Sequence, residues 1–80
     1  MNVDPRHYNA WWGLGSIALK QENYAEAEQN FGFAIDINNK SAPLWTYRGM
    51  ALENIKKTNI AIKCFDRAEQ IDPRNPMNKF

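Results

Sequence analysis

The chain has 80 residues, 44% of them hydrophobic, and its ten basic and nine acidic side chains leave a net charge of +1. A chain of this size buries only about 60% of the surface that it exposes when unfolded, so it holds at most one small folded unit. The balanced charge argues against a nucleic-acid partner, and no stretch approaches the roughly 18 apolar residues that a membrane span requires.

The first helix is predicted from apolar residues three and four positions apart, which is the spacing of one helical face. These residues are Trp11, Leu14, Ile17 and Ala18. The polar residues 20–23 then break the pattern, and we expect Asn23 to close the helix because asparagine tolerates the left-handed conformation. Before this helix, residues 1–7 lack the apolar core of a signal peptide, which favours an intracellular protein, nuclear or cytoplasmic.

A second helix is predicted over residues 24–37. Its inward-facing residues are Ala27, Phe31, Ala34 and Ile35. Residues 38–41 form the next polar break. Ser41 is placed to cap the following helix, and Pro43 falls in its first turn, where a missing N–H costs nothing.

The second half of the chain repeats this plan. One helix is marked by Leu44, Trp45, Arg48, Leu52 and Ile55, and the next by Ile60, Ala61, Cys64, Phe65, Ala68 and Ile71. Residues 56–58 separate them, with Thr58 as the expected N-cap. Pro73 ends the last helix, because the residue before a proline is disfavoured in the helical conformation.

The two halves are related by an offset of 34 residues. The matching pairs include Trp11 and Trp45, Gly15 and Gly49, Ala27 and Ala61, Phe31 and Phe65, and Ala34 and Ala68. This spacing of Trp, Leu-Gly, Ala, Phe and Pro is typical of the tetratricopeptide repeat (TPR). We therefore predict an all-α fold, a segment of helix-turn-helix solenoid with repeats at residues 8–41 and 42–75 and the start of a fifth helix at 76–80. Two repeats leave their stacking faces uncovered, so we expect the isolated chain to self-associate.

Small residues predict where the two helices of each repeat cross, because helices approach closely only where side chains are small. Gly15 and Ala27 are placed at this crossing in the first repeat, and Gly49 and Ala61 in the second. The large rings of each repeat are expected to fill the space around it.

Five runs of sequence carry a more specific resemblance: residues 3–15, 20–22, 35–38, 71–76 and 79–80. They are similar to the carboxyl-terminal repeats of a TPR scaffold in the anaphase-promoting complex, the one that receives the Ile-Arg tail of a co-activator. The resemblance implies a protein–protein interaction scaffold in a cell-cycle ubiquitin ligase, with the co-activator tail and neighbouring subunits as partners. The chain departs from the usual pattern at Glu22 and Lys56, where such repeats often carry glycine, and at Arg48, which replaces a leucine.

No group of side chains in the sequence suits catalysis or metal binding. His7 is the only histidine and Cys64 the only cysteine, which leaves too few ligands for zinc and no internal disulfide. We expect His7 in a solvated turn, Cys64 as a packed structural thiol, and Glu26 and Glu28 on a solvated helix face. The sequence therefore predicts neither an enzyme nor a cofactor.

The remaining candidate site is the inner face of the solenoid. In TPR proteins the first helix of each repeat lines the concave surface, and the resemblance implies the same here. By register, this face consists of Asn9, Trp12, Gly13, Ser16 and Lys20 in the first repeat and Thr46, Tyr47, Met50, Glu53 and Asn54 in the second.

The aromatic residues near this face are expected to divide by role. Trp11 and Trp45 belong to the core. Trp12 and Tyr47 lie beside the core stripe, and serve either as packing residues at its rim or as peptide anchors, with a slight preference for anchors because aromatic residues dominate interface hot spots. Among the polar candidates, the asparagine amides suit hydrogen bonds to a peptide backbone, and Glu53 suits an arginine.

Two alternatives stay open. One is a carboxylate-clamp TPR, which holds the acidic tail of a heat-shock chaperone. Such a clamp needs Lys and Asn at matched inner positions, where this chain has Trp12 and Ser16, then Tyr47 and Met50. The other is a structural spacer with no ligand of its own. Changes at Trp12 or Tyr47 that alter binding without lowering stability would separate a binding face from a spacer.

Overall fold

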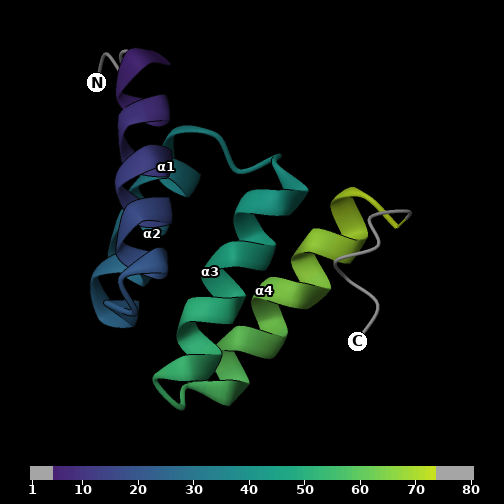
Figure 1. Cartoon of the computed structure of the whole chain (residues 1–80). Coiled ribbons are helices and arrows are strands. Elements are labelled where there is room, and N and C mark those ends of the chain that lie inside the picture. The colour runs from purple at the N-terminus through teal and green to yellow at the C-terminus, as the bar shows by residue number, and fades with distance from the viewer. Residues whose placement is uncertain (1–4, 74–80) are drawn as a thin grey trace.

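The computed structural model describes residues 5–73, with side chains from His7 onward, and within that range it contains helices and no strand. In chain order, these are α1 (Pro5–Lys20), α2 (Tyr24–Ile37), α3 (Ala42–Asn54) and α4 (Thr58–Ile71). Figure 1 shows α1 paired with α2 and α3 paired with α4, and α2 also packs against α3. This confirms the all-α prediction, while the predicted start of a fifth helix at 76–80 lies outside the described residues. None of the described helices has both the length and the apolar character needed to cross a membrane.

The turns that end α1 and α3 are built alike. Glu22 and Lys56 adopt positive φ angles of 62° and 66°. After Glu22, the N–H of Asn23 donates to the carbonyl of Ala18 at 2.8 Å, which satisfies one of the free carbonyls at the end of α1. The left-handed residue is therefore Glu22, and the prediction that Asn23 closes α1 is wrong. Asn23, with φ of −85°, is instead the N-cap of α2.

The helix starts agree only in part with the sequence prediction. Helix α1 begins earlier than expected, so His7 is exposed on the helix and not in a turn. The N-cap of α4 is Lys57, because its carbonyl already accepts the first helical hydrogen bond, so the prediction of Thr58 as the cap is wrong. Ser41 does occupy the N-cap of α3, although its side chain makes no capping hydrogen bond, and Pro43 lies in the first turn.

Within each helix pair, a phenylalanine ring covers a glycine. A Cβ atom added at Gly15 would lie 2.7 Å from the ring of Phe31, and one added at Gly49 would lie 2.8 Å from the ring of Phe65. Neither position accepts a side chain unless the ring moves, and the ring over Gly15 is fully buried, so it has no free space to move into. The alanines predicted at the same crossings are both buried: Ala27 and Ala61. The predicted crossing points are therefore confirmed.

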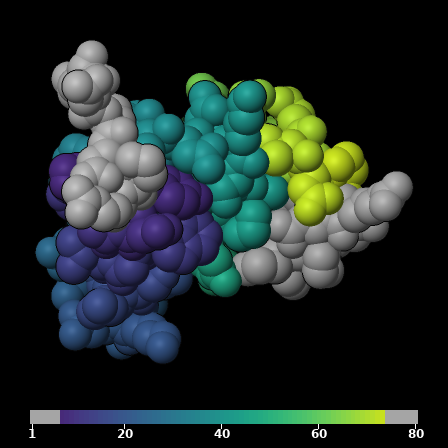
Figure 2. All heavy atoms as spheres, turned by 90° about the horizontal axis from the view of Figure 1, so that it is seen from above, coloured from purple at the N-terminus to yellow at the C-terminus, as the bar shows by residue number. Residues whose placement is uncertain are grey.

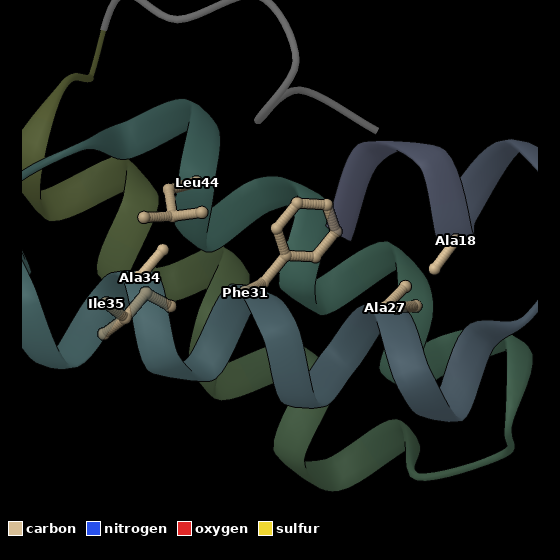
Figure 3. Packing of buried hydrophobic residues seen from close by; sticks show 7 residues of the cluster. Ala18, Ala27, Phe31, Ala34, Ile35 and Leu44 are labelled. Carbon is tan, nitrogen blue, oxygen red and sulfur yellow. The ribbon is translucent and has the colours of Figure 1, made fainter. Parts of the chain in front are cut away.

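The larger part of the core joins three helices. Figure 3 shows its side chains meeting around α2: Ala18 from α1, Ala27, Phe31, Ala34 and Ile35 from α2, and Leu44 from α3. The inward-facing residues predicted for α2 are thus all buried. Because Leu44 of α3 joins the same cluster, α2 packs against both α1 and α3, and this packing determines how the second helix pair lies beside the first.

The apolar stripe predicted for α1 is only partly buried. Ala18 is buried, but Leu14 and Ile17 are 49% and 53% exposed. On α4, Ile60 is exposed as well, although the sequence placed it on the buried stripe. Helices α1 and α4 are the outermost of the row, and within the described residues nothing packs on their outer sides. The apolar stripes predicted from the sequence therefore include residues that the two helix pairs leave exposed.

The junction between the two pairs carries an ion pair. Nη2 of Arg48 on α3 lies 2.9 Å from Oε1 of Glu28 on α2, and both side chains are largely buried. Glu28 was expected on a solvated face, and this prediction is wrong because α3 covers that side of α2. The guanidinium also lies across Gly32, where an added Cβ would be 3.4 Å from Nη2. An arginine therefore fits at this position because its partner helix supplies a carboxylate and a gap.

Candidate protein-binding face

The face shared by α1 and α3 has an aromatic floor. The rings of Trp12 on α1 and Tyr47 on α3 lie edge to face with centroids 5.7 Å apart. Each also contacts Phe31 of α2, with both centroid distances at 6.1 Å. Tyr8, one helical turn before Trp12, extends the cluster at 6.5 Å. Such ring pairs add about 0.5–1.5 kcal/mol beyond the area that they bury, so the cluster stabilises the fold as well as shaping the face.

Trp12 and Tyr47 are both half-buried against the core, which leaves part of each ring open to solvent. They are therefore packing residues at the rim of the core, and an anchor role can only involve the exposed remainder of each ring. The cluster forms because the two repeats differ at this point: Trp12 corresponds to Thr46, and Tyr47 corresponds to Gly13. The cluster therefore takes one ring from each repeat and is not itself repeated.

Most of the polar candidates on this face are accessible. Asn9, Lys20, Glu53 and Asn54 are exposed, and Ser16 is half-buried. Asn54 uses one amide N–H to donate to the carbonyl of Met50 at 2.8 Å, within its own helix, so its Oδ1 and its second N–H are left for a ligand. Met50 is exposed and adds an apolar side chain beside the aromatic floor.

Thr46 does not belong to the accessible face. Its side chain is buried and its hydroxyl donates to the carbonyl of Ala42 at 3.1 Å. The expectation that it points inward to a ligand is wrong, because its side chain is buried.

Trp11 and Trp45, expected in the core, lie at its edge. Both are half-buried and pack against the buried cluster. Trp11 stacks against the exposed Phe33 of α2 with ring centroids 4.6 Å apart. Nε1 of Trp45 donates to the carbonyl of Asn39 at 2.8 Å, which ties the loop between the two repeats to α3. The sequence missed these contacts, and it also missed Tyr8, although its four-residue spacing from Trp12 is a usable signal.

The only cysteine has no features of a nucleophile. Cys64 is buried on α4, as predicted. Burial raises the pKa of the Cys64 thiol, and the charge of Arg48, which favours the thiolate, does not outweigh this effect. Reactive cysteines need a lowered pKa and access to solvent. Cys64 is therefore a structural residue.

With this geometry established, comparison with known proteins decides the family. The sequence model of the tetratricopeptide repeat family matches residues 8–41 and again residues 42–75. The chain belongs to the tetratricopeptide repeat family. The paired helices and the glycine–phenylalanine crossing in each TPR are the structural counterpart of that match.

Individual TPR proteins are also similar to this chain. It is 39% identical over 74 residues to cell division cycle protein 27 homolog B of Arabidopsis thaliana, which covers 92% of the chain and 10% of that protein. It is 36% identical over 80 residues to anaphase-promoting complex subunit 3 of Schizosaccharomyces pombe, which covers 100% of the chain and 12% of that protein. A match to protein unc-45 homolog B of mouse is 39% identical over 60 residues. The chain thus spans about a tenth of the first two relatives, and its resemblance to TPR subunits of the anaphase-promoting complex is supported.

Proposed function

We propose that this chain is a non-catalytic interaction scaffold of the anaphase-promoting complex, and that its α1–α3 face holds the carboxyl-terminal tail of a partner protein. The observation that carries this proposal is the half-buried aromatic pair of Trp12 and Tyr47, which joins two TPRs into one surface. The similarity to a subunit named for the complex supports the choice of assembly. Aromatic side chains that are fixed by packing bind at low entropic cost, which suits them to act as the floor of a binding site.

Charged residues at one end of this face suit a tail that ends in arginine. Figure 1 shows α1 and α3 running in the same direction, so their carboxyl ends lie at the same end of the molecule. Lys20 is the last residue of α1, and Glu53 lies in the last turn of α3; both are exposed. A terminal arginine carries a carboxylate and a guanidinium, which complement Lys20 and Glu53 respectively. The residue before it, if apolar, would meet Met50 and the aromatic floor.

Titration calorimetry with two peptides tests the proposal. One peptide ends in Ile-Arg, and the second has the same sequence without these two residues. We expect heat from the first alone, a clear loss of affinity in Glu53→Gln, and no loss in Glu69→Gln, an exposed carboxylate on α4. No binding of the Ile-Arg peptide would contradict the proposed ligand.

Other outcomes of the same titration identify the alternatives. A peptide with an acidic carboxyl-terminal tail that binds better than the Ile-Arg peptide would indicate a carboxylate clamp. That function is disfavoured because this part of the face carries Trp12 and Tyr47, whose rings already pack on each other, in place of Lys and Asn. If no peptide gives a heat of binding, the chain is better explained as a structural spacer with no ligand of its own.

A further inference from the structure

The two outermost helices present apolar residues on their outer sides. On α1, Leu14 and Ile17 are 49% and 53% exposed, and on α4, Ile62 is 50% exposed. Figure 2 shows α1 and α4 on opposite sides of the molecule, with α3 between them. These side chains cannot meet within one chain. Each needs a partner from outside if it is to be buried.

The junction between α2 and α3 shows how two TPRs of this sequence fit together. Arg48 of α3 lies across α2, where it contacts Glu28 and passes over Gly32. Ala51, one turn further along α3, is fully buried in the cluster that includes α2. These contacts define which positions of a first helix meet which positions of the helix before it.

The same junction can be transferred by the 34-residue offset of the repeats. The offset takes Arg48 to Leu14 and Ala51 to Ile17 on α1, and it takes Glu28 to Ile62 on α4. The ion pair of the internal junction thus becomes a pair of apolar side chains, each about half exposed in the isolated chain. The outer sides of α1 and α4 are therefore both apolar at the positions that would meet, and every chain carries both surfaces.

We propose that copies of this chain associate head to tail, with α4 of one copy packed on α1 of the next as α2 packs on α3. Leu14 would then lie against Ile62, and Ile17 would take the buried place of Ala51. Because the two surfaces are different, the contact is heterologous and leaves a free face at each end of the assembly. The assembly therefore grows beyond a dimer as concentration rises.

One residue opposes this contact and gives a means to adjust it. Asp66 stands at the position that corresponds to Gly32, beneath the place where Leu14 would lie. Its carboxylate is exposed in the isolated chain and would lose water at the contact, which is costly without a partner. Asp66→Ala removes this cost, so it should tighten the association.

Sedimentation velocity of the full chain, over a range of concentrations, tests the proposal with a pair of complementary variants. Leu14→Glu blocks the α1 face and Ile62→Glu blocks the α4 face, so each variant alone should be monomeric, and the two blocked faces repel each other. Mixed together, they still have one intact face each, and they should form a one-to-one dimer that does not grow further. Ile60→Glu is the matched control, since Ile60 is a similarly exposed isoleucine on α4 but about 200° around the helix from Ile62.

The outcomes separate head-to-tail contact from its competitors. Growth of the unmodified chain, a capped dimer in the mixture, tighter association of Asp66→Ala and no effect of Ile60→Glu would support the proposal. A monomer at every concentration would overturn it. Association of one blocked variant on its own would indicate a symmetric contact and would also overturn it. Association of both blocked variants on their own would indicate an exchange of helices between chains, with the same consequence. Circular dichroism melts verify that each variant is folded, so that loss of association is not loss of structure.

Discussion

The two glycines of α1 provide a matched test of how closely α1 and α2 approach. A Cβ added at Gly13 would find no atom within 4 Å, whereas one added at Gly15 would lie 2.7 Å from two atoms of the buried Phe31 ring. In a helix, glycine is less favourable than alanine by about 0.5–1 kcal/mol, chiefly because it loses more backbone entropy. Gly13→Ala should therefore raise the free energy of unfolding by about that amount.

Gly15→Ala gains the same entropy but must displace a ring that has no free space. Overpacking of a core costs about 1–3 kcal/mol. The net change at Gly15 is then between about zero and 2.5 kcal/mol of destabilisation, and the two variants should differ by about 1–3 kcal/mol. Because the substitution, the helix and the two neighbouring turns are the same, this difference isolates the contact with Phe31.

Urea denaturation followed by far-ultraviolet circular dichroism measures the difference, and thermal melts should separate the variants by about 4–8 °C for each kcal/mol. Phe31→Leu in the Gly15→Ala background serves as a second test, because a smaller side chain removes the clash. The cost of Phe31→Leu should therefore be lower in that background than in the unmodified chain. Equal stabilisation by Gly13→Ala and Gly15→Ala would refute the packing described here.

Three further changes probe the turns, the junction and the buried thiol. Glu22→Gly and Lys56→Gly should each raise the urea midpoint, by up to about 1 kcal/mol in unfolding free energy, because a side chain at positive φ is strained and glycine is not; lower midpoints would contradict the left-handed turns. A double-mutant cycle on Arg48 and Glu28, with alanine at each, should give a coupling free energy of about 0.5–1 kcal/mol. This coupling should fall little with added salt, since the pair is largely buried. A coupling of zero would exclude the ion pair. Because the pKa of Cys64 is raised in the folded chain, the unfolded chain loses the thiol proton first as pH rises. The free energy of unfolding should therefore fall above about pH 8.5. Cys64→Ala should reduce this fall, and an unchanged slope would show that the thiol is not the cause.

The repeat spacing was enough to predict the helices, their pairing and the small residues at their crossings. This worked because Gly15, Phe31 and their counterparts are fixed by contacts inside one repeat, which recur at constant spacing. The closing residue of α1 was missed because propensity favours Asn23, whereas the geometry of the turn requires the left-handed conformation one residue earlier, at Glu22.

Contacts between repeats were the part that the sequence could not supply. Leu14 and Ile17 fit the helical stripe, but whether they are buried depends on a neighbour that the spacing does not identify. Glu28 and Arg48 read as unrelated surface charges until the packing of α3 on α2 brings them together. On the candidate face, register included the buried Thr46 among the inward-pointing residues, and it could not show that Trp12 and Tyr47 contact each other.

The central claim is that the α1–α3 face receives the tail of a partner, and backbone amide shifts in a nitrogen-15 NMR titration locate the bound peptide directly. With an Ile-Arg-terminated peptide, the shifts should concentrate at Ser16 and Lys20 on α1 and at Met50 and Glu53 on α3, and the indole signal of Trp12 should move with them. Shifts confined to the outer sides of α2 or α4, or no shifts at a saturating concentration of peptide, would contradict the claim.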